Sequence, residues 1–99
     1  MDGLTFTWDV NKAKLNQQKH GVSFQEASTV FADEFARLRC DPDHPDEQRF
    51  LILGISSRQR LLVVCHSEAD EITLRLISAR PATKNETRQY WYFSHAKRI

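Results

Sequence analysis

The sequence predicts one α+β domain in which helices pack on a curved antiparallel β-sheet. Four segments in the later part of the chain are apolar, or alternate between apolar and polar residues, as strands do. Short links join these segments, which favours antiparallel pairing because parallel pairs need long crossovers. Helix-start patterns lie in the first third of the chain and again near its end. The expected order of elements is therefore β-α-α-β-β-β-β-α.

Length and composition limit what the protein can be. A chain of 99 residues is expected to form a single domain over residues 1–99. The net charge is only +1, so a nucleic-acid role requires cations that gather on one face. No apolar run reaches the roughly 20 residues of a membrane span, and the N-terminus carries no secretory pattern. Cys40 and Cys65 are expected to be reduced thiols, which favours a cytoplasmic location.

The first third of the chain predicts an edge strand followed by two helices. Residues 5–8 alternate polar and aromatic side chains, and Asp9 is a suitable N-cap for a helix that ends near Lys19. Gly21 can take the left-handed conformation that closes such a helix. Ser23 and Glu26 form a capping box that opens a second helix, which runs to about residue 32. The expected apolar side of the first helix is Val10, Ala13 and Leu15, and the expected core residues of the second are Phe24, Ala27, Val30 and Phe31.

The middle of the chain predicts three strands. Residues 35–40 alternate, and a loop with two prolines follows. Residues 49–57 and 61–66 are almost continuously apolar and are joined by a tight connection, so they form a hairpin.

The segment from Glu71 to Tyr90 is read as one strand running into one helix, and it carries the candidate site. Pro81 ends the strand because proline lacks the N–H that a ladder needs. Thr83 and Glu86 form a capping box for a helix from about residue 84. A strand end and a helix N-terminus therefore meet where three cations gather, and such a place binds phosphate. These cations are Arg75, Arg80 and Lys84.

Two segments, Lys19-His20-Gly21 and Ile77-Ser78-Ala79-Arg80, are the most specific of a set of short motifs spread over residues 6–90. Either segment would be weak alone, but together, in this order and at this distance, they resemble the BrnT family. The other motif positions are Phe6, Trp8, Asp9, Lys12, Asn16, Val22, Ser23, Phe24, Glu26, Ala27, Val30, Phe31, Asp33, His44, Glu47, Arg49, Gly54, Ser56, residues 60–64, Ala82, Thr83, Glu86 and Tyr90. The sequence departs from the expected pattern at Pro81, where a lysine would stand.

The resemblance implies a function and partners. BrnT proteins are toxins of prokaryotic type II toxin–antitoxin systems, with a fold similar to RelE ribonucleases. A BrnA-type antitoxin neutralises them, and operator DNA is bound only through the antitoxin. The resemblance implies a ribonuclease that arrests translation when free, and a complex that holds two toxins. The aromatic residues Trp91, Tyr92 and Phe93 are predicted to form part of the surface that the antitoxin covers, or a contact in a toxin dimer.

Metal-independent RNA cleavage needs a proton acceptor, charge stabilisation at phosphorus and a proton donor for the leaving oxygen. His20 suits proton transfer, and Arg75 and Arg80 suit a phosphate clamp, with Lys84 adding charge. No metal and no cofactor is expected. The residues predicted to contact RNA are Lys12, Lys19, Arg58, Arg60 and Tyr90, the last by stacking a base or passing a proton.

Each candidate also has a structural interpretation. His20 can simply close a helix, and Arg80 and Lys84 can be solvated charges at an element boundary. Arg75 can pair with Asp70 or Glu71 across a strand. For Glu47 and Arg49, a structural ion pair is favoured over catalysis, and Cys65 is expected to be buried. A competing hypothesis for the whole chain is a non-catalytic module that only binds a DNA-binding antitoxin.

Overall fold

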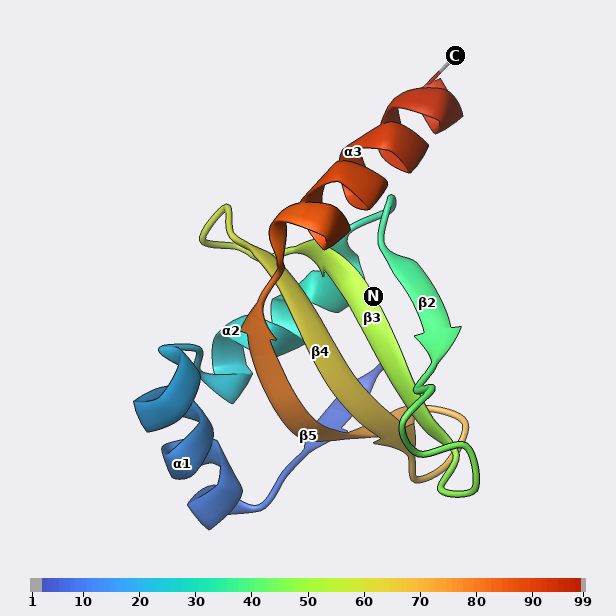
Figure 1. Cartoon of the computed structure of the whole chain (residues 1–99). Coiled ribbons are helices and arrows are strands. Elements are labelled where there is room, and N and C mark those ends of the chain that lie inside the picture. Colours follow the sequence, from blue (N-terminus) through green and yellow to red (C-terminus); the bar gives the residue numbers. More distant parts are fainter. Residues whose placement is uncertain (1–2, 99) are drawn as a thin grey trace.

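The computed structural model describes residues 3–98, with side chains as far as Ser94. The elements are β1 (Thr5–Thr7), α1 (Val10–His20), α2 (Phe24–Ser28), the 3₁₀ turn η1 (Thr29–Ala32), β2 (Arg37–Cys40), β3 (Arg49–Ile55), β4 (Leu61–Glu68), β5 (Thr73–Pro81) and α3 (Lys84–Arg98). This is the predicted order, with η1 replacing the last turn of the second helix. Figure 1 shows a sheet with α2 behind it, α1 beside it and α3 projecting from one end. None of the described helices is long and apolar enough to cross a membrane.

The five-stranded sheet has the order β1-β5-β4-β3-β2. Strands β2 to β5 form the predicted antiparallel meander. β1 pairs with β5 in parallel, through Thr5 to Thr73 and Thr7 to Arg75, so the sheet is mixed. The expectation of a purely antiparallel sheet is therefore wrong at this edge. Most of the chain separates β1 from β5, and the argument from short links does not apply to such a pair.

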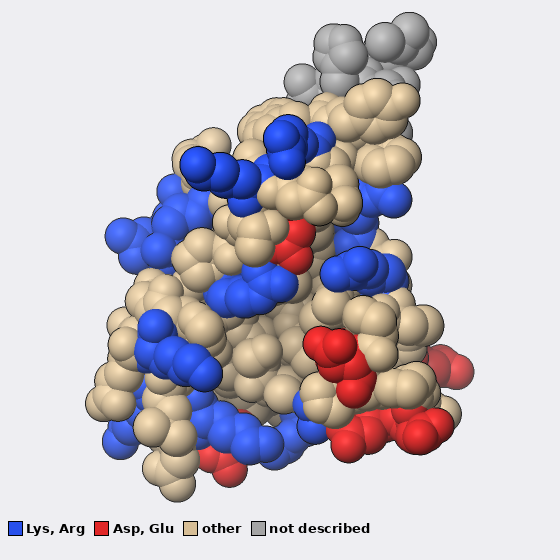
Figure 2. All heavy atoms as spheres, in the orientation of Figure 1, with Lys and Arg blue, Asp and Glu red and all other residues tan. Residues whose placement is uncertain are grey.

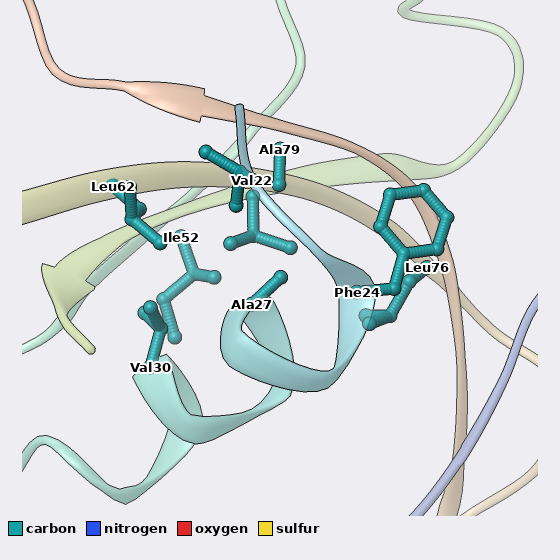
Figure 3. Packing of buried hydrophobic residues seen from close by; sticks show 9 residues of the cluster. Val22, Phe24, Ala27, Val30, Ile52, Leu62, Leu76 and Ala79 are labelled. Atoms are coloured by element: carbon teal, nitrogen blue, oxygen red, sulfur yellow. The ribbon is translucent and has the colours of Figure 1, made fainter. Parts of the chain in front are cut away.

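One face of the sheet carries the core, and the other is open. Side chains of α2 and η1 pack against alternate residues of β3, β4 and β5, as Figure 3 shows. The predicted core of the second helix is confirmed for Phe24, Ala27 and Val30, which are fully buried, while Phe31 packs at its margin. The opposite face of the sheet turns toward the reader in Figure 1.

Helix α1 is capped as predicted but packs differently. The Asp9 carboxylate accepts hydrogen bonds from the backbone N–H groups of Asn11 and Lys12, at 2.8 and 3.1 Å. Gly21 has φ of 69°, which closes the helix. Val10 and Leu15 are 63% and 64% exposed, so the predicted apolar side is wrong for both. The helix lies along the edge of β5 and presents little surface to the core.

The buried residue of α1 is Asn16, whose amide replaces a missing strand partner. β1 covers β5 only from Thr73 to Arg75, which leaves the backbone of Ala79 without a neighbouring strand on that side. The Asn16 Oδ1 accepts from the Ala79 N–H at 3.0 Å, and its Nδ2 donates to the Ala79 carbonyl at 2.9 Å. Nδ2 also donates to the carbonyl of Val22 at 2.9 Å. One side chain thus fixes α1 and the following turn to the sheet.

We expect Asn16→Ala to lower the free energy of unfolding by about 2 kcal/mol, because buried backbone groups lose their partners. Urea denaturation measures this change. The exposed neighbouring residue supplies the control, and Gln17→Ala should stay within about 0.5 kcal/mol of the parent protein. Equal stability of the two variants would contradict the role given to Asn16.

A bulge in β5 sets which side chains reach the open face. The register between β4 and β5 shifts between Cys65 and His66, so that Ser67 pairs with Arg75 while Val63 pairs with Arg80. Residues directly opposite each other share a face of the sheet, and Val63 and Ser67 lie four apart on one strand. Arg75 and Arg80 therefore both lie on the open face, although five positions separate them.

Candidate functional site

A row of four residues crosses the open face from one arginine to another. Arg37 of β2 is in register with Leu53 of β3, and Leu53 is in register with Val63 of β4. Val63 in turn is in register with Arg80 of β5. With strands about 4.8 Å apart, the backbones of the two arginines are roughly 14 Å apart. The row thus places one guanidinium group on each side of two aliphatic side chains.

A hollow of about 160 Å³ lies over three residues of this row, Arg37, Leu53 and Val63. Its lining comes from β2, β3, β4 and the first turns of α3: Arg37, Leu38, Arg39, Leu51, Leu53, Val63, Glu86 and Gln89. Figure 2 shows Lys and Arg side chains along the upper and left parts of this face, beside a floor of uncharged residues, with Asp and Glu side chains mainly at its lower right. The modest net charge is therefore compatible with a locally cationic surface.

Arg80 is held in one orientation by Glu86. Its Nη1 and Nη2 donate to the two carboxylate oxygens at 2.8 and 2.9 Å, a bidentate pair. The predicted capping box is confirmed, since Glu86 Oε1 also accepts from the Thr83 N–H and Thr83 Oγ1 accepts from the Glu86 N–H. The hydrogen bonds from Arg80 lower the pKa of Glu86 to about 2, so Glu86 is a carboxylate at neutral pH. Nη1 also donates to the Pro81 carbonyl at 3.3 Å, and the Arg80 side chain is 39% exposed.

The three cations predicted to gather do so only in part. Lys84 begins α3 directly after β5 and is exposed, so it belongs to the same junction as Arg80. Arg75 shares their face, but at about 3.3 Å per residue it lies roughly 15 Å from Arg80 along the strand. It also makes no ion pair with Asp70 or Glu71 among the described side chains. Arg75 therefore extends the cationic surface and does not converge on the same point.

His20 lies in a second, shallow depression, at the edge of β5. Lys12, Lys19 and His20 of α1 line it together with Leu15, Ile77 and Ser78. Ser78 precedes Arg80 by two residues, so the two share a face of the strand. The structure thus brings the three predicted residues of α1 together beside the strand that carries Arg80. No hydrogen bond joins His20 to Arg80 among the described residues.

Comparison with known proteins identifies the family. The family model described as "Ribonuclease toxin, BrnT, of type II toxin-antitoxin system" matches residues 8–86. The chain belongs to this family. It is a BrnT ribonuclease toxin, as the motif resemblance implies.

A solved structure supports the fold. The 1.1 Å crystal structure of the ribonuclease toxin BrnT from Brucella abortus is similar, with a TM-score of 0.66 and 20% sequence identity. The similarity covers 82% of this chain and 99% of that chain. A search of curated protein sequences finds no match. The similarity to RelE stays a prediction.

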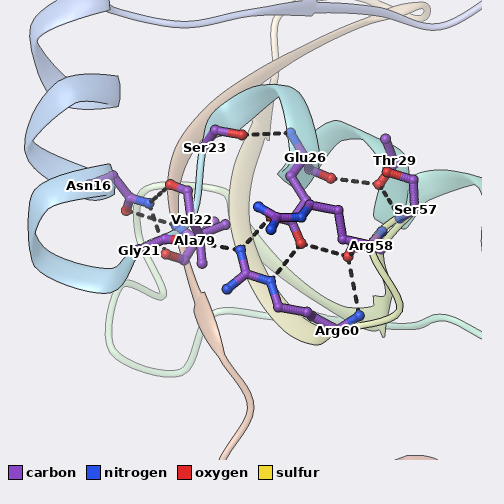
Figure 4. A network of polar contacts seen from close by, with 11 residues as sticks. Asn16, Gly21, Val22, Ser23, Glu26, Thr29, Ser57, Arg58, Arg60 and Ala79 are labelled. Atoms are coloured by element: carbon purple, nitrogen blue, oxygen red, sulfur yellow. Dashed lines mark hydrogen bonds and ion pairs between the residues drawn. The ribbon is translucent and has the colours of Figure 1, made fainter.

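Several residues of the BrnT motifs hold the fold together, and Arg60 is the first of them. Figure 4 shows its guanidinium bound to the carboxylate of Glu26, with Nε donating to Oε2 at 2.9 Å and Nη2 to Oε1. Nη2 also donates to the Gly21 carbonyl at 3.0 Å. The hydrogen bonds from Arg60 hold the pKa of Glu26 below its usual value. Arg60 thus has a structural ion pair where sequence predicted RNA contact, whereas Arg58 is 72% exposed and reaches Glu26 only at 3.8 Å.

Tyr90 is the clearest correction among the predicted RNA contacts. It is 2% exposed, and its hydroxyl donates to Asp33 Oδ2 at 2.6 Å. The same carboxylate oxygen accepts from the Ile55 N–H at 2.9 Å. A ring this buried cannot stack on a base, so that prediction is wrong. Tyr90 instead fastens the start of α3 to the body of the toxin.

Two structural interpretations from the sequence are confirmed. Arg49 Nε lies 2.8 Å from Glu47 Oε2, the expected ion pair. Cys65 is buried at 6% exposure.

Gly54 is a further motif position with a packing role, because a Cβ there would lie 2.9 Å from Val30 Cγ1 and 3.0 Å from Ala36 Cβ.

Sequence reasoning missed the β2 side of the hollow. Arg37 and Arg39 both point to the open face, and Arg37 lies over the ring of Phe93, with 3.4 Å from Cζ to the ring centroid. The alternation of residues 35–40 was the available signal, because it puts both arginines on one face of a strand. Gln89 gave no comparable signal, since its position depends on how α3 leaves the sheet.

Proposed function

We propose that this toxin is a metal-independent endoribonuclease of the cytoplasm that binds RNA across the open face of its sheet and arrests translation. The observation that carries the proposal is the placement of Arg80. It stands on the open face in a fixed orientation, and the depression with Lys12, Lys19 and His20 lies next to its strand. A pre-oriented guanidinium stabilises a phosphorane without reorganising during the reaction.

The proposed roles follow from residue chemistry. Arg80 binds the scissile phosphate, and Lys84 adds positive charge at the helix N-terminus beside it. His20 moves a proton to or from the reacting oxygen, because its imidazole ring has one nitrogen that can accept a proton and one that can donate it. Lys12, Lys19, Arg58 and Arg75 contact phosphates farther along the RNA chain. Pro81, where the family pattern has a lysine, is in register with the core residue Leu62, so a side chain at this position lies on the opposite face of β5 from Arg80.

We further propose that a BrnA-type antitoxin neutralises the toxin by covering the exposed aromatic part of α3. Trp91, Tyr92 and Phe93 are 50%, 71% and 39% exposed on a helix that projects from the body. Exposed rings of this size mark protein contacts. Operator DNA would be reached only through the antitoxin, and the same surface would serve a toxin dimer.

The experiment measures cleavage of single-stranded RNA in EDTA by the parent toxin and four variants. We expect Arg80→Ala to lower the cleavage rate by roughly 10²- to 10³-fold and His20→Ala by roughly 10²-fold or more. Arg75→Ala and Lys84→Ala should have smaller effects, because both side chains are exposed. Lys14→Ala is the matched control, an exposed cation of α1 outside both depressions, and should cleave at the parent rate.

Two outcomes would overturn the proposal. If all four variants are folded and cleave as fast as the parent toxin, the site is wrong. If the parent toxin leaves RNA intact in EDTA, the metal-independent mechanism is wrong. The first result would redirect the search to other cations of the described chain, and the second would favour a module that acts only with its antitoxin.

A further inference from the structure

The hollow on the open face has an apolar floor that a phosphate does not need. Leu51 and Leu53 form the floor together with Val63, which is 5% exposed. Arg37 lines the hollow, and Arg80 lies just beyond its lining, in register with Val63. Guanidinium groups alone suffice to hold phosphate oxygens. Aliphatic side chains between them suit a planar, apolar surface, and the faces of nucleobases are such surfaces.

The walls of the hollow offer hydrogen bonds at its rim. Gln89 lies one turn after Glu86 on α3 and is exposed, so its amide presents both a donor and an acceptor. Arg37 is restrained on the opposite side by its contact with the Phe93 ring. An apolar floor, a polar rim and flanking cations match the parts of a nucleotide: base face, base edge and phosphates.

The size of the hollow limits the base. A dry cavity of about 150 Å³ lined by aliphatic and aromatic side chains holds benzene. The hollow measures about 160 Å³, which is room for one six-membered ring and its substituents. A pyrimidine, the smaller of the two base types, fits this volume with its substituents.

We propose that this hollow is a base-binding subsite that takes one unstacked pyrimidine of single-stranded RNA. The inference rests on the proposed binding of RNA to the open face. Leu51, Leu53 and Val63 contact the ring face, and Gln89 hydrogen-bonds the ring edge. Arg37 and Arg80 hold the phosphates on either side, so the base is unstacked beside the phosphate that Arg80 binds. Preference for a pyrimidine next to the cleaved bond follows.

The test measures binding of short fluorescent 2′-O-methyl oligonucleotides by anisotropy, with cleavage of unmodified RNA followed in parallel. The 2′-O-methyl group removes the attacking hydroxyl, so binding is measured without reaction. We expect oligo-U to bind more tightly than oligo-A to the parent toxin. Leu53→Trp fills the hollow without changing charge and should weaken oligo-U binding roughly ten- to hundredfold.

Three further variants keep the test decisive. Ile72→Trp adds the same ring at a 56% exposed position outside the hollow and should bind oligo-U like the parent toxin. Gln89→Ala changes an exposed helix residue, so it tests the rim even if Leu53→Trp does not fold, and should weaken oligo-U binding several-fold. Gln18→Ala, an exposed glutamine of α1, is its control.

The outcomes separate this subsite from the proposed function. Cleavage by the parent toxin, with oligo-U binding unchanged in Leu53→Trp or Gln89→Ala, would overturn the subsite and leave the ribonuclease mechanism standing. Equal binding of oligo-A and oligo-U would also overturn it. Weaker binding in both variants, without cleavage by the parent toxin in EDTA, would support the subsite and refute the metal-independent mechanism.

Discussion

Glu26→Ala should lower the free energy of unfolding by about 3 kcal/mol, because it breaks a buried ion pair at one end. The side chain of Glu26 is 4% exposed, and its Oε2 accepts hydrogen bonds from Ser56 Oγ at 2.7 Å and from Arg60 Nε at 2.9 Å. Without the carboxylate, the buried Ser56 hydroxyl loses its partner, and Arg60, whose side chain is 35% exposed, keeps only its bond to the Gly21 carbonyl among the described residues. Chemical denaturation of the purified toxin measures the change.

Gln25→Ala is the matched control for this variant, one residue earlier on α2 and exposed. It should change the stability by no more than about 0.5 kcal/mol. The Glu26→Gln variant keeps the volume and one acceptor oxygen and should fall between the two. If Glu26→Ala were as stable as Gln25→Ala, the network in Figure 4 would contribute nothing to the fold.

The toxin should lose about 3 kcal/mol of stability between pH 8 and pH 4 through His66 alone. His66 is 3% exposed, with its ring against Phe31 and Phe50, and neither ring nitrogen has a hydrogen-bond partner among the described residues. Burial lowers the pKa of His66 from 6.5 to about 4. The unfolded chain therefore binds a proton between these values while the folded chain does not, so stability falls as the pH falls through this window.

His66→Leu removes the titrating group and keeps an apolar side chain at this site. The difference in stability between the variant and the parent toxin should shift by about 3 kcal/mol in favour of the variant on going from pH 8 to pH 4. Comparing the two pH values cancels the change in packing, which is the same at both. Parallel stability curves for the two proteins would contradict the prediction. They would mean that His66 binds a proton equally well in the folded and the unfolded chain.

Local patterns in the sequence predicted local structure well. Asp9, Gly21 and the Thr83–Glu86 capping box act as expected, because their partners lie within four residues. The Ser23–Glu26 box is only half formed: Ser23 Oγ accepts from the Glu26 N–H, but the Glu26 carboxylate turns to Arg60. A charged donor 34 positions away is the stronger partner, and a local motif cannot reveal it.

Long-range contacts account for the remaining differences. Periodicity suggested that Leu15 faces the core, whereas α1 is held by the amide of Asn16 and leaves Leu15 in solvent. Tyr90 was predicted to contact RNA, but in the fold its hydroxyl donates to Asp33, a residue 57 positions earlier in the chain. The predicted residue Arg80 lies on the open face of β5, whereas Arg37 on the β2 side of the hollow was missed because no sequence pattern fixes the distance between β2 and α3.

Because of the bulge in β5, the extent of the cationic surface depends on the number of residues between Arg75 and Arg80. Arg75 and Arg80 share the solvent side only because Ile77 is one residue in excess of the pairing with β4. Deleting or inserting a single residue between them would rotate one guanidinium into the apolar layer beneath the sheet. A change of one residue in the length of this segment would therefore remove a positive charge from the open face in a single step.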